Sequence, residues 1–224
     1  MGIINFGLPK KKVNYLKNLF NLSIFVEGGT YIGLTAYEQS KNFKKVYTIE
    51  KSKKMIELSK KRLDGSNNII QLSGDTRDHL KKILLNNDNI LFWLDSHWSG
   101  GETYGKDDEC PLLDELKIIF NYPLKNFVIL IDDARLFLSP PPLPHKIESW
   151  PNIRQIFNFI PSSYDVVISE DVIIIFPVST NFLKFMQNKN TEDWQKLSSL
   201  SFFSRSLKIL IFIKNKVKNL INLN

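Results

Sequence analysis

The fold of this chain is decided by residues 24–35, which read Ile-Phe-Val-Glu-Gly-Gly-Thr-Tyr-Ile-Gly-Leu-Thr. The apolar, β-branched run Ile24–Glu27 predicts a strand, and a helix is expected over Thr35–Ser40. The glycines between them allow the backbone to turn tightly and to approach a ligand at the start of the helix. The stretch therefore predicts a binding turn between strand and helix, with an ordinary turn of an α/β fold as the alternative.

The same alternation of strand and helix continues along the chain. Four further apolar runs predict strands, and three amphipathic segments between them predict helices. Because helices that alternate with strands cover both faces of a parallel sheet, this order indicates an α/β fold. The further strands are expected at Val46–Ile49, Ile69–Leu72, Ile90–Leu94 and Phe127–Ile131, and the further helices at Ser52–Leu63, Thr76–Leu85 and Pro111–Phe120.

The pattern changes after the fifth strand. The proline-rich segment Ser139–His145 cannot form regular structure, and a short helix is expected over Pro151–Ile160. Two strands, Tyr164–Ser169 and Val172–Phe176, then follow in such close succession that they must be antiparallel, with Glu170-Asp171 as their turn. The sequence thus predicts a Rossmann-like, doubly wound sheet of five parallel strands with helices on both faces and a C-terminal antiparallel hairpin.

The chain of 224 residues is long enough for one domain and an appendage. We expect a globular domain over residues 1–180 and a basic, amphipathic tail of two helices over residues 181–224. The tail holds eight basic and two acidic residues, so six of the seven net positive charges lie there. It is expected to dock on the domain, to pair with a second copy as a homodimer, or to lie on a membrane surface. In its second helix, apolar side chains recur at helical spacing at Phe203, Leu207, Leu210, Val217 and Ile221.

Charge and cysteine content bound the class of protein. The nearly neutral globular part argues against a nucleic-acid groove. Cys110 is the single cysteine, which excludes intrachain disulfides and thiolate-rich metal sites and fits a reducing compartment. The first residues lack the apolar core of a signal peptide, and no apolar run is long enough to span a bilayer. We expect a cytoplasmic protein, and a peripheral contact with the inner membrane surface is left open.

Acidic residues follow the first three expected strands. Glu27 precedes glycines that do not form the dinucleotide pattern G-x-G-x-x-G, and an acid there suits a cationic ligand such as S-adenosylmethionine, which carries an ammonium and a sulfonium. Glu50 lies roughly 20 residues past the glycine turn, where a carboxylate can accept both hydroxyls of a ribose, although strand-end glutamates are also common. Asp75 is expected either to face the adenine edge or to cap the next helix.

Three more carboxylates follow the fourth and fifth strands. Asp95 and the pair Asp132-Asp133 are expected to converge at one rim of the sheet, near the point where such folds bind ligands. Carboxylates so close together repel one another, and a hard divalent ion such as Mg²⁺ is a natural partner for an all-oxygen cluster. Such an ion can activate a substrate hydroxyl. The alternative is that one or more of these acids cap a helix or pair with Arg135.

His97 lies two residues past Asp95 and is a candidate general base, because its unperturbed pKa is close to neutrality. A structural loop histidine is the alternative. The segment Gly100–Asp108 is polar and glycine-rich and is expected to form a mobile cover over the site, and His145 is a candidate for a substrate lid. Cys110 is interpreted as structural, since no histidine partner for it is evident.

These motifs together resemble bacterial class I S-adenosylmethionine-dependent methyltransferases, nearest to members linked to surface-glycan clusters and more distantly to the metal-dependent O-methyltransferases of the macrocin and catechol types. The resemblance covers residues 20–177. It implies that Asp95, Asp132 and Asp133 hold Mg²⁺ and that the cofactor is S-adenosylmethionine. The motifs are V-E-G-G-T-Y-I-G-L-T-A, Glu50, the G-D-T turn, W-L-D-S-H-W-S-G-G, E-C-P-L-L-D-E-L and I-L-I-D-D-A-R, and the expected cofactor-binding residues are Glu27, Gly28, Gly29, Thr30, Gly33, Glu50 and Asp75.

The sequence therefore predicts a methyltransferase that modifies a hydroxyl of a small molecule or glycan with the assistance of a divalent metal. His97 and Asp95 are the expected catalytic residues. Two alternatives stay open, a catalytically degenerate interaction module at a membrane surface and an RNA methyltransferase. The absence of an Asn/Asp-Pro-Pro-aromatic motif argues against methylation of amino groups on nucleic-acid bases.

Overall fold

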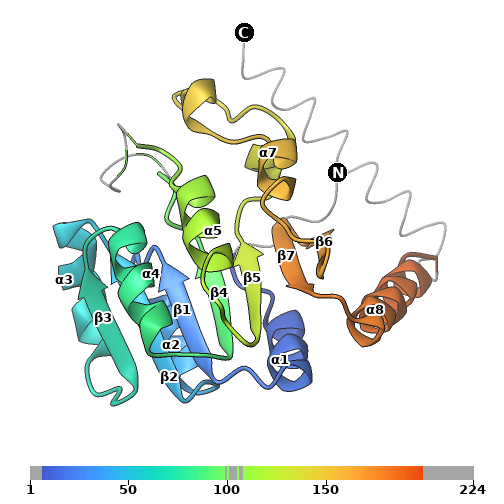
Figure 1. Cartoon of the computed structure of the whole chain (residues 1–224), viewed down its shortest axis with the longest axis horizontal. Coiled ribbons are helices and arrows are strands. Elements are labelled where there is room, and N and C mark those ends of the chain that lie inside the picture. Colours follow the sequence, from blue (N-terminus) through green and yellow to red (C-terminus); the bar gives the residue numbers. More distant parts are fainter. Residues whose placement is uncertain (1–6, 99, 101–104, 106–107, 199–224) are drawn as a thin grey trace, which may run out of the picture. The chain divides into compact units, whose positions relative to one another are not determined.

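The computed structural model describes residues 7–98, 100, 105 and 108–198 of the chain (Figure 1). The chain divides into two compact units, Met1–Ser179 and Thr180–Asn224. The first unit contains one seven-stranded sheet with its helices, and the described part of the second unit is the single helix α8 (Thr180–Ser198).

The sheet confirms the predicted fold, with strand order β3-β2-β1-β4-β5-β7-β6. The first five strands are parallel, whereas β7 runs antiparallel to both of its neighbours, β5 and β6. Strand order reverses at β1, and this switch point is where doubly wound sheets bind ligands. The strands are β1 (Ile24–Gly28), β2 (Lys45–Glu50), β3 (Ile69–Ser73), β4 (Ile90–Leu94), β5 (Phe127–Ile131), β6 (Tyr164–Ser169) and β7 (Val172–Pro177).

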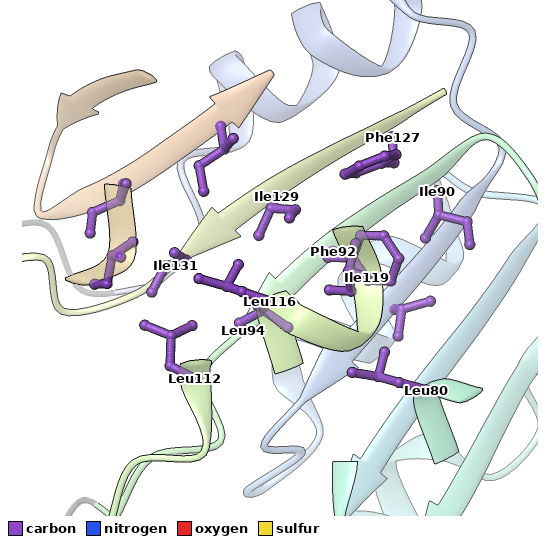
Figure 2. Packing of buried hydrophobic residues seen from close by; sticks show 14 of the residues in the cluster. Leu80, Ile90, Phe92, Leu94, Leu112, Leu116, Ile119, Phe127, Ile129 and Ile131 are labelled. Atoms are coloured by element: carbon purple, nitrogen blue, oxygen red, sulfur yellow. The ribbon is translucent and has the colours of Figure 1, made fainter. Parts of the chain in front are cut away.

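The main core lies between the central strands and two helices, α4 (Thr76–Leu85) and α5 (Leu112–Phe120). Every residue of β4 and β5 is buried, and alternate side chains of a strand point to the same face of the sheet. One set of alternate side chains therefore meets α4 and α5, as Figure 2 shows. The labelled residues of this packing include Ile90, Phe92 and Leu94 of β4, Ile129 of β5, Leu80 of α4, and Leu116 and Ile119 of α5.

Two other helices, α2 (Leu34–Ser40) and α3 (Lys53–Leu63), contact β2 and β3. Figure 1 shows α4 and α5 in front of the sheet and α2 behind it, so helices cover both faces as predicted. The alternate residues of β4, Leu91 and Trp93, are equally buried on the second face. At the carboxyl end of each parallel strand, a loop connects the strand to the next helix.

Sequence analysis missed helix α1 (Lys10–Leu19). Its run of lysines conceals a short apolar face, of which Val13 and Leu16 are fully buried. One lysine of the run, Lys12, is itself buried, because its ammonium pairs at 2.7 Å with Glu170 in the turn between β6 and β7. A buried lysine with a partner elsewhere in the chain has no signature in local sequence.

The connection between β5 and β6 was only partly predicted. Helix α7 (Ile153–Phe157) is shorter than the expected Pro151–Ile160, and it begins at a capping box formed by Asn152 and Gln155. Two further short helices, α6 (Arg135–Leu138) and the 3-10 helix Ile147–Ser149, lie before it. The expected turn Glu170-Asp171 is confirmed, with both residues at positive φ as in a tight hairpin turn.

The second unit is described only in part. Helix α8 matches the first of the two helices expected in the tail, and the second expected helix, with Phe203 to Ile221, lies outside the described residues. The roles expected for the tail, as a membrane contact or a dimer contact, stay predictions. Among residues 7–198, apart from the gaps given above, the helices lack the combination of length and hydropathy needed to cross a bilayer.

Candidate functional site

The turn after β1 brings the ends of two strands into direct contact. Gly29 has a φ of +88°, and a Cβ built on it would lie 2.2 Å from the carbonyl oxygen of Asp95, at the end of β4. The N–H of Gly29 donates at 3.0 Å to the carbonyl of Ile49 in β2. Gly33, with a φ of +75°, precedes α2 and packs closely against α3. Position 29 therefore has no space for a side chain, and its conformation is one that favours glycine.

Glu50 lies at the end of β2, beside this turn. Its carboxylate accepts the backbone N–H of Tyr31 at 2.9 Å and that of Ser52 at 2.8 Å. Because a carboxylate offers about four lone-pair sites, about two remain for a ligand. Both backbone donors fix the direction of the carboxylate, as a residue that binds ribose hydroxyls requires, and the ribose contact itself stays a prediction.

Glu27 is buried next to the glycine turn, with only 1% of the residue exposed. The hydroxyl of Thr30 contacts that of Thr48 at 2.6 Å, and Thr48 donates to the Glu27 carboxyl at 2.5 Å. Burial raises the pKa of Glu27 to about 8, and the nearby Asp95 adds to this effect, whereas the hydrogen bond from Thr48 opposes it. Glu27 and Thr30 were both expected to bind the cofactor. In this structure they are linked through Thr48 by hydrogen bonds that attach the turn to β2.

A crevice opens at the carboxyl ends of β1, β2 and β3. It is narrow, with a cavity volume of about 50 Å³, and it opens to solvent. Three of the expected cofactor-binding residues, Gly29, Glu50 and Asp75, line it together with Ser96 from the loop after β4. The predicted residues therefore meet at one opening, on the side of the sheet where its strand order reverses.

Asp75 caps α4, which was the alternative stated for it: its carboxylate accepts the N–H of Arg77 at 3.0 Å. The Arg77 guanidinium also donates to both of its oxygens, and Lys51 Nζ lies 2.8 Å from Oδ2. These hydrogen bonds, above all those from Arg77, hold the pKa of Asp75 well below its usual range. Four donors occupy about four acceptor sites, so a contact with adenine, which stays a prediction, requires one donor to move.

Sequence analysis did not single out Arg77, which joins three segments around the crevice. Besides Asp75, its guanidinium contacts Asp108, at the end of the glycine-rich loop, and Asp114 of α5 at 3.2 Å. A cation two residues after the helix cap was the only local signal. Its acidic partners lie 31 and 37 residues further along the chain, and only the tertiary structure brings them to it.

The second cluster lies at the rim formed by β4 and β5. Asp95 follows β4, and Asp132-Asp133 follows β5, where the N–H of Asp132 donates to the carbonyl of Leu94 at 3.2 Å. Burial raises the pKa of Asp95 to about 8 and that of Asp132 to about 6, and in each case a neighbouring aspartate adds to the rise. The three acids are therefore close enough to influence one another, as the strand order implies.

His97 lies between two of these acids. Its Nε2 is 3.1 Å from Oδ2 of Asp133 and 3.7 Å from Oδ1 of Asp95, and the residue is only 8% exposed. Burial opposes the charged form of the imidazole, but the hydrogen bond to Asp133 and the charges of Asp95, Asp133 and Asp132 outweigh it and raise the pKa of His97. These contacts favour the charged form of the imidazole beside the carboxylates.

Asp133 is also bound on its other side. Its Oδ1 lies 2.7 Å from the Arg135 guanidinium, which contacts Asp171 in the β6–β7 turn, and the N–H of Arg135 donates to Asp171 at 2.9 Å. Asp133 has a φ of +55°, a conformation that costs free energy in a non-glycine residue. The stated alternative, an acid paired with Arg135, is thus what the structure shows for Asp133.

We tested whether the three acids fit the expected magnesium ion. Both oxygens of Asp133 carry protein donors, from His97 and Arg135, and Oδ1 of Asp132 accepts the N–H of Asp133 at 2.8 Å. Within the described residues, no group of three or more histidine, cysteine or acidic side chains is arranged to hold a metal ion. Side-chain cations stand where the ion was expected, so the arrangement does not fit Mg²⁺.

Two buried carboxylates near this rim were missed. Glu109 accepts from Trp150 Nε1 at 2.7 Å, and Glu115 of α5 accepts from the hydroxyl of Ser96 at 2.5 Å. Burial raises the pKa of Glu115 to about 7. Both residues lie in the E-C-P-L-L-D-E-L motif, so the motif itself was the available signal, but nothing in it indicated which acids are buried.

Other expectations have mixed outcomes. Most of the expected cover Gly100–Asp108 lies outside the described residues, so that expectation stays a prediction. His145, expected in a lid, lies 3.2 Å from the Glu109 carboxylate and is held in the loop after β5. Burial raises the pKa of the Cys110 thiol to about 12, which agrees with its structural interpretation.

Several solved structures share this fold, and those with good superposition are methyltransferases by description. A proposed caffeoyl-CoA O-methyltransferase from Staphylococcus aureus matches with a TM-score of 0.55 and 12% identity, over 78% of this chain and 86% of that chain. A methyltransferase from Geobacter sulfurreducens matches with a TM-score of 0.52 and 12% identity, over 79% and 81%. A proposed methyltransferase from Streptococcus mutans, in complex with SAH, matches with a TM-score of 0.53 and 13% identity, over 78% and 100%.

No protein-family model matches the chain, and no curated protein matches its sequence. The structural likenesses confirm the predicted class I methyltransferase fold. At such low sequence identity these likenesses bear on the fold alone.

The contact at Gly29 predicts the outcome of a substitution. In Gly29→Ala, the added Cβ overlaps the Asp95 carbonyl, so the turn must move, and we expect the free energy of unfolding to fall by about 2 kcal/mol or more. Urea unfolding measures this. Gly65→Ala is the matched control, since Gly65 has a φ of +82° but no atom near its added Cβ. Equal losses in both variants would show that backbone strain alone is responsible, against the contact proposed here.

Proposed function

We propose that this chain is a methyltransferase that uses S-adenosylmethionine to methylate a hydroxyl group of a small molecule or glycan. The observation that carries the proposal is the shared crevice of Gly29 and Glu50, which opens beside the rim of Asp95 and His97. One side offers a cradle for a nucleoside, and the other offers acid–base groups. The nearly neutral charge of residues 1–180 supports an acceptor other than a nucleic acid.

The residues around the crevice fit the proposed cofactor. Gly29 leaves the backbone of the turn open to close approach, and Glu50 has acceptor sites left for two ribose hydroxyls. When bound, S-adenosylmethionine supplies a methyl group on a sulfonium.

The residues at the rim are placed to accept the proton of the acceptor hydroxyl. His97 and Asp95 would take up the proton of the acceptor hydroxyl, and bound S-adenosylmethionine would supply the methyl group that replaces this proton. Asp133 holds the imidazole in place through its 3.1 Å hydrogen bond, and Arg135 holds Asp133. The contributions proposed for these residues are orientation and proton transfer.

Binding of S-adenosylmethionine to the full chain, measured by isothermal titration calorimetry, tests the proposal. We expect saturable binding, and in Glu50→Ala a Kd about 10- to 100-fold higher, because two hydrogen bonds to hydroxyls are lost. Glu57→Ala is the control, since that side chain on α3 is exposed. Absence of binding by the unaltered chain would instead favour the interaction module.

Chelation tests the role expected for magnesium. Because His97 and Arg135 already compensate the rim carboxylates, we expect turnover in EDTA to stay within about twofold of turnover with Mg²⁺. Tritiated methyl transfer to a panel of methyl glycosides and catechol measures turnover, and the electron paramagnetic resonance of Mn²⁺ measures metal binding directly. Loss of activity in EDTA that Mg²⁺ restores, with Mn²⁺ bound at the rim, would restore the metal-dependent reaction and contradict this expectation.

The rim also predicts a pH dependence. Burial raises the pKa of Asp95 to about 8, so below about pH 8 its carboxyl carries a proton and cannot take up the proton of the acceptor; the pKa of His97 is raised as well. We therefore expect kcat/KM for S-adenosylmethionine to rise about tenfold per pH unit and to level off above about pH 8. His97→Asn should lose most activity together with this dependence. A flat profile in the unaltered enzyme is incompatible with the proposed acid–base role.

A further inference from the structure

Glu109 is a buried carboxylate outside the reacting cluster. It is 1% exposed, and its oxygens accept from the Trp150 indole N–H at 2.7 Å, from the backbone N–H of Lys146 at 3.2 and 3.3 Å, and from His145 at 3.2 Å. Burial alone would raise the pKa of Glu109, but the hydrogen bonds from Trp150, Lys146 and His145 outweigh it and lower the pKa. An ionised carboxylate thus binds three residues of a loop 36–41 positions away in the chain.

The backbone of Glu109 is attached to a different segment. Its carbonyl accepts the N–H of Trp98 at 2.7 Å, directly after His97. The residue therefore joins the loop after β4 to the proline-rich connection after β5. Asp95 and His97 belong to the first of these segments, and Asp132 and Asp133 lie at the start of the second.

Trp150 links Glu109 to the rim, because its N–H binds Glu109 and its ring packs against His97. Its ring centroid lies 5.2 Å from that of His97, and Phe137 packs at 5.7 Å from the same indole. Trp150 is only 6% exposed, and its N–H is bound to Glu109, so its rotation is restricted at both ends of the ring. The face that it presents to His97 is consequently set by the Glu109 carboxylate.

The orientation of His97 depends on this packing against Trp150. Its Nε2 lies 3.1 Å from Asp133 but 3.7 Å from Asp95, so a small rotation of the imidazole exchanges one acid for the other as its closer partner. Asp95, Asp132, Asp133 and Glu115 interact electrostatically with it, and the ring of the uncharged Trp150 packs beside it and limits its movement. Displacements of about 1 Å in catalytic groups can reduce rates by about 100-fold.

We infer that Glu109 is a positioning residue for the transfer reaction: by fixing Trp150 against His97, it sets the orientation of the imidazole between Asp95 and Asp133. The inference rests on the proposed function as far as catalysis is concerned. The structural link from Glu109 through Trp150 to His97 stands without it.

Glu109→Gln is the informative variant. The amide keeps the size of the side chain but has one acceptor oxygen, and its NH₂ group meets donors of Trp150, Lys146 or His145. Trp150→Phe is a milder second variant, because it keeps a smaller aromatic ring beside His97 and removes the indole N–H that Glu109 holds. Glu57→Gln, at an exposed position on α3, is the control for the spectrum of His97.

The direct readout is the NMR spectrum of the histidine rings in the full chain, which has three histidines. His97→Asn assigns the His97 signals, and Trp150→Leu gives their positions without the indole ring current. In Glu109→Gln we expect the His97 signals to move toward those of Trp150→Leu, with a smaller shift in Trp150→Phe and no change in Glu57→Gln. In the methyl-transfer assay we expect kcat to fall about 10- to 100-fold, while KM and Kd for S-adenosylmethionine stay unchanged.

Two results would overturn the inference. Unchanged His97 signals in both Glu109→Gln and Trp150→Phe would remove the link itself. Loss of cofactor affinity in parallel with kcat would show that Glu109 only maintains the fold. If the unaltered chain neither binds the cofactor nor transfers a methyl group, the proposed function fails, whereas the NMR comparison still decides whether Glu109 positions His97.

Discussion

The candidate site depends on the close approach of the β1 turn to the end of β4. Gly29 lies so near the Asp95 carbonyl that no side chain fits, and its positive φ lets the backbone turn back over β2. This contact places the Glu50 side of the crevice beside the rim that carries His97. If the two strand ends lay further apart, the nucleoside cradle and the acid–base groups would belong to separate sites.

Around this contact, buried carboxylates are stabilised locally in two different ways. Asp75 is held ionised by Arg77 and Lys51, and Asp133 by His97 and Arg135. Glu27 has no cationic partner in the part of the chain that the structure describes. Burial raises its pKa to about 8, which favours the neutral carboxyl at pH 7. Because an uncompensated charge is costly in the interior, each carboxylate either binds a donor or takes up a proton. The same rule explains why Arg135 and His97 stand where a metal ion was expected.

The segments that complete the rim are irregular and far apart in sequence. The loop after β4, the residue Glu109 and the connection through Trp150 meet only through hydrogen bonds and ring contacts. Loops positioned by a rigid sheet commonly carry binding and catalytic residues. In this protein the sheet fixes where the loops begin, and the buried Glu109 carboxylate fixes how two of them lie against each other.

The sequence by itself determined the strand and helix order, the antiparallel hairpin, the glycine turn and the acids at the strand ends. It did so because alternation of apolar residues, glycine and turn residues act over a few neighbouring positions. Only the tertiary structure decided that Glu27 is buried next to its turn, that Arg77 occupies Asp75, and that His97 and Arg135 bind Asp133. It also revealed helix α1, whose Lys12 is buried against Glu170. Burial and the choice of partner depend on residues tens of positions away, and no local pattern records them.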